Sequence, residues 1–342
     1  MPEQAKRHHL VSKFYLRYFA DEADKIVTVM LPGERRFTQG IGNASVQTHF
    51  YTAVGLDGQL TDAAETAFGY IETAAAAAWR EFTAGAWPLS PAGREQVAGW
   101  VALQLLRGSR VRNSMSQLGT DMLRLEVIAG GRRRLREVLR EVGEPHDDES
   151  VDREWIALFE NPLEVEAHAN HHVLHIAKLL PRVTASLLDR WWILTAFERK
   201  SLATSDHPVH IVPNPAQAAM GMGTGIENAD EIHVPLTRRL ALSMHLRATL
   251  PEELAGQVAD RKQDGVAKIA LYSNSCTVNG ARRMLFHHPA DNPLSGFDLP
   301  EPRTREVQAA GGLWRFMADE DRQVLIDAGI ESDEGAADVE DM

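Results

Sequence analysis

Cysteine is almost absent from this chain, whose 342 residues include one, Cys276. A single cysteine can form neither an internal disulfide nor a cysteine-rich zinc site, so the sequence predicts a reducing, cytoplasmic location. Long apolar runs are also missing. Without about 18 consecutive apolar residues, we expect no membrane-spanning helix.

Basic residues are not in excess either. The 36 Lys and Arg are outnumbered by 48 Asp and Glu, which gives a formal net charge of −12. Proteins that coat nucleic acids need clustered Lys and Arg, so this class is disfavoured, although a local basic groove stays open. The common signatures of serine hydrolases, P-loop enzymes and dinucleotide-binding enzymes do not occur.

Hydrophobic residues make up 44% of the chain, which is enough for a sizeable core. The residues after Asp62 and after Ser90 follow helical spacing, and Ser90 followed by Pro91 is a helix start signal. Shorter alternating segments predict strands, and a last helix is expected near the end of the folded part. The predicted strands are 24–30, 190–198, 210–212, 231–237 and 240–246, and the last helix is about 260–286.

These elements predict an α+β fold, with a predominantly helical middle packed on a small, mainly antiparallel sheet formed by N- and C-terminal strands. We expect one domain over residues 1–300, with a helical core at about 60–190 and a sheet-rich part at about 190–250. Residues 301–342 are expected to be a peripheral segment that ends in an acidic, disordered tail at 331–342.

Four histidines lie within the segment EAHANHHVLH, residues 166–175. On a helix, His171 and His175 are spaced four apart and could bind one transition metal together. The same stripe continues into Lys178 and Arg182, which is typical of a solvated helix flank. One helix rarely supplies more than two metal ligands, so we favour the solvated flank over the metal site.

Several short polar and aromatic motifs follow one another along the chain. They are His9 before an aromatic run ending in Phe19, Glu65 and Glu72 seven apart, Gln104 and Arg107 three apart, a Thr-Ser-Asp-x-Pro step at 204–208, and Asn274 seven residues before Ala281-Arg282-Arg283. Together and in this order, they resemble a bacterial family known as domain-of-unknown-function family 4238, from about His9 to Phe286. The proline that the family places after its first histidine falls on Ser12 here. The resemblance implies no established activity.

The polar residues of these motifs predict one pocket between the helices and the sheet. A histidine can act as general acid or base near neutral pH. Carboxylates can hold Mg²⁺ or Mn²⁺, and an arginine can bind a phosphate or carboxylate through two parallel hydrogen bonds. We assign catalytic roles to His9, Glu65, Glu72, Asp206 and Asn274, substrate binding to Gln104 and Arg107, and candidate metal binding to Glu65, Glu72 and Asp206.

This set of residues favours a metal-assisted hydrolase that acts on a phosphodiester or a similar anion, with a small anionic ligand or nucleic acid as partner. Two alternatives stay open: a non-catalytic ligand-binding or sensor module in a defence or regulatory system, and an iron-dependent oxidase that uses Glu72 or the histidines at 168–175. Purely structural roles carry equal weight for three residues, and for Asn274 this role would be a hydrogen bond within the protein. Asp206 could tie a turn, and Arg107 could form an internal ion pair.

Overall fold

The computed structural model describes residues 7–55, 58–160, 166–249, 253, 258–303 and 317–330. The chain forms two compact units: residues 1–111 with 168–304 make unit 1, and residues 112–167 with 305–342 make unit 2. The prediction of one domain over 1–300 therefore needs correction, because part of the helical middle packs around a separate apolar core. The predicted tail at 331–342 lies outside the described residues.

The main sheet of unit 1 has five strands in the order β12-β7-β11-β10-β9. Neighbouring strands pair antiparallel, except that β12 runs parallel to β7. Successive side chains of a strand point to opposite faces, so the alternation in β10 and β11 gives one apolar and one polar face. The strands are β7 (Trp191–Ala196), β9 (His210–Val212), β10 (Glu231–Thr237), β11 (Leu240–His245) and β12 (Arg261–Asp264).

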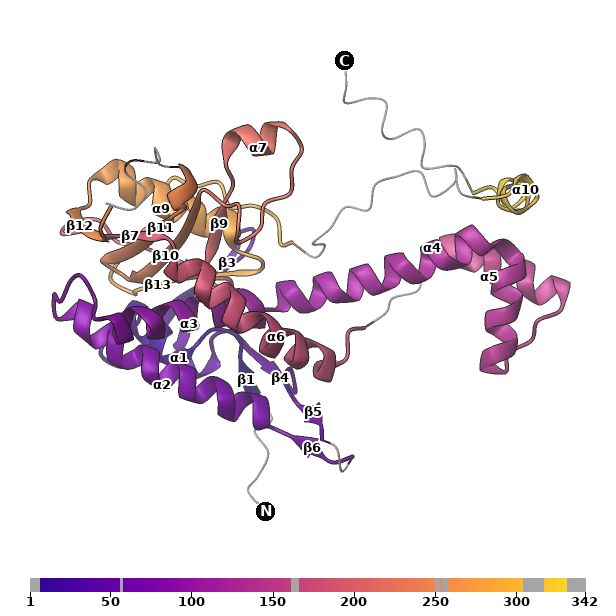
Figure 1. Ribbon diagram of the computed structural model, residues 1–342, viewed down its shortest axis with the longest axis horizontal. Helices are drawn as coiled ribbons and strands as arrows, with labels where there is room; N and C mark the ends of the chain where they lie inside the picture. The colour runs from indigo at the N-terminus through magenta and orange to yellow at the C-terminus, as the bar shows by residue number, and fades with distance from the viewer. Residues whose placement is uncertain are drawn as a thin grey trace. The chain divides into compact units, whose positions relative to one another are not determined.

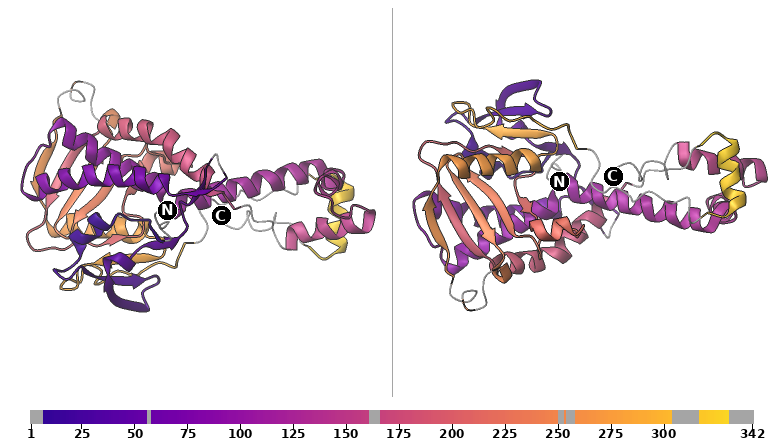
Figure 2. Two further views of the ribbon diagram at one scale, coloured as in Figure 1. Left: turned by 90° about the horizontal axis from the view of Figure 1, so that it is seen from below. Right: turned by 90° about the horizontal axis from the view of Figure 1, so that it is seen from above.

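Helices cover both faces of this sheet (Figure 1, Figure 2). Helices α2 (Ala63–Thr83), α3 (Pro91–Arg107) and α6 (Ala169–Leu188) lie on the apolar face, and α9 (Ala267–Gly280) lies on the polar face. The predicted start of α3 is confirmed, because the Ser90 hydroxyl oxygen accepts a hydrogen bond from the Gly93 N–H at 3.1 Å.

A second sheet of unit 1 joins strands from both halves of the chain. Its order is β3-β2-β13-β8, and every pair is antiparallel. Strands β2 (Lys25–Met30) and β3 (Arg35–Gly40) come from the N-terminal part, whereas β8 (Thr204–Ser205) and β13 (Met284–His287) come from the C-terminal part. The predicted α+β class, with a sheet shared by N- and C-terminal strands, is therefore confirmed.

Short elements complete unit 1. Strand β1 (Arg7–His9) pairs antiparallel with β4 (Val46–Thr48), and this pairing holds the segment that carries the first motif. Other short elements are β5 (Ala53–Val54), which pairs with β6 (Leu60–Thr61), and the helices α1 (Lys13–Leu16) and α7 (Pro215–Ala219).

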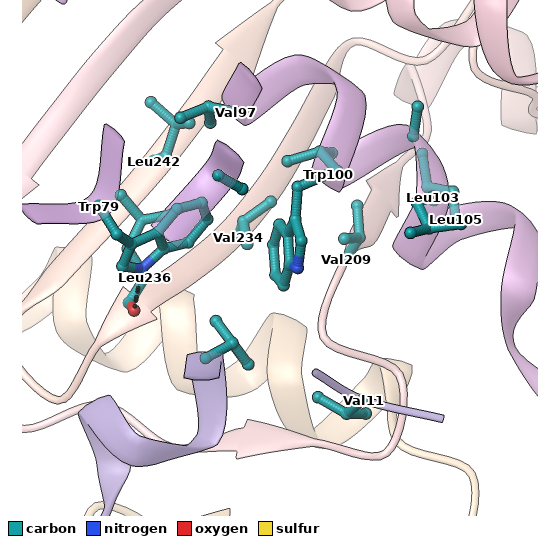
Figure 3. Packing of buried hydrophobic residues seen from close by; sticks show 14 of the residues in the cluster. Val11, Trp79, Val97, Trp100, Leu103, Leu105, Val209, Val234, Leu236 and Leu242 are labelled. Atoms are coloured by element: carbon teal, nitrogen blue, oxygen red, sulfur yellow. Dashed lines mark hydrogen bonds between the residues drawn. The ribbon is translucent and has the colours of Figure 1, made fainter. Parts of the chain in front are cut away.

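The core of unit 1 lies between the five-stranded sheet and the helices on its apolar face (Figure 3). Trp79 of α2 and Trp100 of α3 are fully buried, with ring centroids 4.7 Å apart in an edge-to-face arrangement. The indole N–H of Trp79 donates to the Leu236 carbonyl oxygen at 3.1 Å, so its burial leaves no unpaired donor. The two rings therefore join α2 to α3, and Trp79 also joins α2 to strand β10.

Unit 2 is helical and has its own apolar core. It is built from α4 (Ser109–Val142, of which residues from 112 onward belong to this unit), α5 (Asp148–Glu160) and α10 (Asp319–Asp327). Val127, Trp155 and Leu325 are each 3% exposed or less and come from these three helices. Gly131, with φ of 64°, breaks the regularity of α4, and a Cβ there would lie 2.1 Å from an Asp321 carboxylate oxygen. Only glycine fits at this position.

The predicted helix at about 260–286 is wrong at both ends. Helix α9 covers Ala267–Gly280, while residues 261–264 and 284–287 are the strands β12 and β13. These strands pair with β7 and β2, which are distant in the sequence, so local residue spacing could not reveal them.

The absence of a membrane span was also predicted. Among the ranges that the structure describes, no helix is both long enough and apolar enough to cross a bilayer.

Replacing Leu242 by alanine should lower the free energy of unfolding by about 2–5 kcal/mol, because a core side chain is lost and a cavity remains. Leu242 is 1% exposed in the centre of the five-stranded sheet, whereas Leu174 of α6 is 52% exposed. Leu174→Ala is the matched control and should change the free energy by less than about 0.5 kcal/mol. Urea unfolding followed by tryptophan fluorescence measures both, and equal losses would contradict the assigned core.

Candidate functional site

Six polar residues gather where the N-terminal segment meets α2 and α3. We call them the N-terminal polar cluster: His9, Ser12, Glu65, Glu72, Gln104 and Arg107. The helical spacing explains their meeting, since Glu65 and Glu72 lie two turns apart on α2 and Gln104 and Arg107 lie one turn apart on α3. Five of the seven residues that we predicted to share a pocket are thus in one cluster.

Arg107 is the centre of this cluster and is 1% exposed. Its Nε donates to the Leu10 carbonyl oxygen at 2.9 Å, and one terminal nitrogen donates to the His9 carbonyl oxygen at 2.8 Å. The other terminal nitrogen lies 2.5 Å from a Glu72 carboxylate oxygen. All three nitrogens are therefore engaged within the protein. Of the two roles that the sequence left open for Arg107, substrate binding and an internal ion pair, these contacts support the ion pair with Glu72.

Ser12 extends this network and explains the position where the resemblance expects proline. Its hydroxyl donates to the Glu72 carboxylate at 2.9 Å and accepts from the Trp100 indole at 2.9 Å and from the Gln104 side-chain amide at 3.0 Å. A proline would supply none of these bonds. Gln104 is 2% exposed and bonded to Ser12, so it too has an internal partner in place of the predicted substrate.

Two side chains of the cluster, His9 and Glu65, have shifted pKa values. Burial, together with the nearby charges of Glu72 and Asp62, raises the pKa of Glu65 to about 7, against the opposing charge of Arg107. Burial lowers the pKa of His9; Glu72 opposes this shift, and Arg107, Lys13 and Arg7 reinforce it.

One polar atom in each of these two side chains has no hydrogen-bond partner among the described residues. Glu65 Oε1 and His9 Nε2 are buried and have no hydrogen-bond partner among the residues that the structure describes. At neutral pH the cluster thus holds a neutral imidazole, on His9, and a carboxyl group with a pKa of about 7, on Glu65.

Asp206 and Asn274 lie outside the N-terminal polar cluster and form hydrogen bonds within the protein, which is the structural alternative that the sequence left open for both residues. The Asp206 carboxylate accepts hydrogen bonds from the backbone N–H groups of Arg282 and Arg283, both at 2.9 Å, and burial raises its pKa to about 6. The Asn274 side chain accepts from the Ala203 N–H at 2.9 Å and donates to the carbonyl oxygens of Ser201 and Pro293. Both hold loops at the second sheet, and neither takes part in the hydrogen bonds of the N-terminal polar cluster.

The predicted metal ligands do not form a coordination sphere. Glu72 is bonded to Arg107 and Ser12, and Asp206 is bonded to backbone N–H groups. Within the described ranges, no three His, Cys, Asp or Glu side chains come together in a way that could hold a metal ion. The residues present therefore do not fit a Mg²⁺ or Mn²⁺ site with three protein ligands.

The histidine run at 166–175 divides between solvent and core. His168 accepts a hydrogen bond from the Asn170 N–H as the cap of α6, and His171 is exposed. His172, which lies off the predicted stripe, is the buried member and bonds the Leu106 carbonyl oxygen at 3.0 Å. His171 and His175 belong to no metal-binding group in the part of the chain that the structure describes.

The sequence did not reveal a polar network between α9 and the five-stranded sheet. His233 bonds the Ser273 hydroxyl at 2.7 Å and Glu231 at 3.1 Å, and the Tyr272 hydroxyl donates to Glu231 at 2.7 Å. This order of carboxylate, imidazole and hydroxyl is that of a hydrolytic triad, but Ser273 is 0% exposed. The network anchors α9. Its signal in the sequence was the placement of Glu231 and His233 at a spacing of two in a strand.

Comparison with known proteins identifies a family for this chain. A family described as "Protein of unknown function (DUF4238)" matches residues 7–291. No curated protein and no solved structure matches.

Replacing Arg107 by methionine should decrease the free energy of unfolding by about 3 kcal/mol, because Glu72 and two backbone carbonyls lose their donor. The control is Arg17→Met, since the Arg17–Asp24 pair is 56% and 46% exposed and should contribute about 0–1 kcal/mol. Denaturant titration measures both. A loss for Arg107→Met no greater than for Arg17→Met would refute the role of the ion pair.

Replacing Glu65 by glutamine should stabilise the protein in a pH-dependent way. The folded-state pKa of about 7 lies above the ordinary value, so the folded wild type binds more protons and loses stability as the pH rises from about 4.5 to 7. Glutamine cannot ionise, so the variant's advantage in Tm should grow over this window and stay constant above it. Glu81→Gln, at an exposed position of the same helix, is the control. A difference in Tm that does not change with pH would contradict the raised pKa.

Proposed function

Because the chain belongs to this family of unknown function, we propose its activity from the N-terminal polar cluster: hydrolysis of an anionic substrate, such as a phosphodiester, with His9 and Glu65 as proton-transfer groups. One observation carries the proposal. A neutral imidazole nitrogen and a carboxyl oxygen that stays protonated to about pH 7 lie in the same partly exposed cluster, and neither atom has a hydrogen-bond partner among the described residues.

The two groups divide the chemistry of hydrolysis between them. His9 has a lowered pKa, so its ring is neutral near pH 7 and can accept a proton from water. Glu65, with a pKa of about 7, can donate a proton to the leaving oxygen at the same pH. A proton acceptor and a proton donor are thus available together just below neutrality.

The anionic character of the substrate follows from the charges around His9. Arg7, Lys13 and Arg107 each act on the imidazole as positive charges. Arg107 is engaged internally, whereas Lys13 and Arg7 are exposed. In this proposal, the exposed cations replace Gln104 and Arg107 as the groups that attract the substrate, and no step requires a metal ion.

A non-catalytic binding module is the second candidate. This candidate is supported by four predicted site residues whose side chains form hydrogen bonds within the protein: Gln104, Arg107, Asp206 and Asn274. A protein of this kind would bind an anion beside His9 without turnover, so measurement of turnover distinguishes the two functions.

His9→Asn and Glu65→Gln should each lower the rate of hydrolysis of bis(4-nitrophenyl) phosphate by about 10²–10⁴-fold, because each removes one proton-transfer group. In the wild type, the rate should rise with pH as His9 loses its proton and fall above about pH 7 as Glu65 loses its own. The rates are measured with EDTA and with Mg²⁺, and Glu81→Gln is the control.

Two results would reject the hydrolase. One is that the wild type hydrolyses neither phosphodiesters nor phosphomonoesters nor carboxylic esters. The other is that His9→Asn and Glu65→Gln retain the rate of Glu81→Gln while their Tm values show that they are folded.

A further inference from the structure

The Glu72 carboxylate has no step of its own in the proton transfers proposed above, although it lies within the N-terminal polar cluster. Its Oε1 atom lies 2.5 Å from a terminal nitrogen of Arg107 and accepts a hydrogen bond from the Ser12 hydroxyl at 2.9 Å. The side chain of Arg107 is 1% exposed and that of Glu72 is 25% exposed. The pair is therefore largely removed from water, where charges act strongly on each other and on their neighbours.

Arg107 also lies beside the two proton-transfer groups. Its other terminal nitrogen donates to the carbonyl oxygen of His9 at 2.8 Å. The guanidinium carbon is 5.9 Å from the centre of the Phe68 ring on α2. On this helix, Phe68 lies one turn from Glu65 and one turn from Glu72. The guanidinium group therefore faces the side of α2 that carries both carboxyl groups.

The two charges of the ion pair act in opposite directions on both proton-transfer groups. A lone guanidinium would disfavour protonation of the imidazole and favour ionisation of the carboxyl group. Burial lowers the pKa of His9, Glu72 opposes this shift, and Arg107 reinforces it. Burial raises the pKa of Glu65 to about 7, Arg107 opposes this shift, and Glu72 reinforces it. The carboxylate thus offsets at each group what the guanidinium would do alone.

Other charged groups near the cluster act on one of the two groups each. Lys13 and Arg7, from the N-terminal segment, lower the pKa of the imidazole, and Asp62, before α2, raises the pKa of the carboxyl group. Among the charges acting on these groups in the part of the chain that the structure describes, Glu72 and Arg107 act on both.

We propose that Glu72 is a positioning residue for the hydrolysis: its carboxylate offsets the positive charge of Arg107 at the two proton-transfer groups, and so sets the pH range in which both are ready to react. This role rests on the function proposed above, and it requires no contact between Glu72 and the substrate. The ion pair then serves two purposes, since it also joins α2 to α3.

The pH dependence of bis(4-nitrophenyl) phosphate hydrolysis tests this role in Glu72→Gln, which keeps the shape of the side chain and removes its charge. Without the carboxylate, Arg107 lowers the pKa of both groups further, so the rising and the falling limb of the profile should both move to lower pH. The ratio of the rate at about pH 8 to the rate at about pH 6 should fall severalfold. Glu81→Gln, at an exposed position of the same helix, should keep the wild-type profile. A lower rate with unmoved limbs would leave Glu72 a purely structural role and overturn the proposal.

Nuclear magnetic resonance of isotope-labelled histidine gives a second readout that does not depend on turnover. The His9 signal, identified by its loss in His9→Asn, should titrate at lower pH in Glu72→Gln than in the wild type. This shift in a protein without hydrolytic activity would reject the proposed function but support the effect of Glu72 on His9. An unchanged titration in a protein that does hydrolyse the ester would overturn the positioning role alone.

A double variant covers the case that Glu72→Gln does not fold, as judged from its Tm. In Glu72→Gln with Arg107→Gln, neither charge of the pair is left without its partner. Because both opposing charges are absent, the limbs of the pH profile and the His9 titration should lie near those of the wild type. A large movement of either in the double variant would show that the two charges do not offset each other, and would overturn the proposal.

Discussion

The buried guanidinium of Arg107 is the interaction on which the arrangement of the first unit depends. It joins α3 to α2 through Glu72 and to the N-terminal segment through two backbone carbonyls. The backbone of the same residue is held as well, because the Tyr51 hydroxyl donates to its carbonyl oxygen at 2.6 Å. A planar group with donors in fixed directions can order three segments at once, which a lysine ammonium could not do in the same geometry.

This tie also explains why adjacent histidines have different environments. Strand alternation turns His8 inward, where its ring nitrogen accepts from the Tyr51 N–H at 2.8 Å, and turns His9 towards the edge of the polar cluster. Arg107 holds the carbonyl of His9, so the imidazole position is set by the same residue that sets Glu72. The contacts that Arg107 makes for structural reasons therefore also position the residues that we propose for hydrolysis.

Sequence reasoning worked where the signal was local. Ser90 followed by Pro91 marked the start of α3, and strands β9 and β10 have the predicted bounds, since alternation and turn residues lie within a few positions. It also grouped Glu65 with Glu72 and Gln104 with Arg107, because helical spacing is a property of one segment. It failed for β12 and β13, whose partners are far away in the chain. For Asp206 it offered the tying of a turn as one of two roles, but it could not identify the partners, since nothing local shows that the backbone N–H groups of residues 282 and 283 reach its carboxylate.

The five-stranded sheet shows how one alternating pattern serves two purposes. Its apolar face buries Trp192, Val234 and Leu242 against helices, while its other face places His233 and Glu231 under α9. Burial on that second face would be unfavourable without partners, and the hydroxyls of Ser273 and Tyr272 satisfy the polar atoms. These hydrogen bonds hold α9 in its position on the polar face of the sheet.

The core of the second unit is formed by residues that are far apart in the chain. Leu325 packs with Val127 and Trp155, and Arg132 of α4 bonds Asp321 of α10 at 2.8 Å. During synthesis on a ribosome, α4 and α5 therefore emerge long before the helix that completes their core. Until residue 325 has been translated, the apolar faces of both helices lack their final partner, and the newly made chain must pass through this interval with those surfaces uncovered.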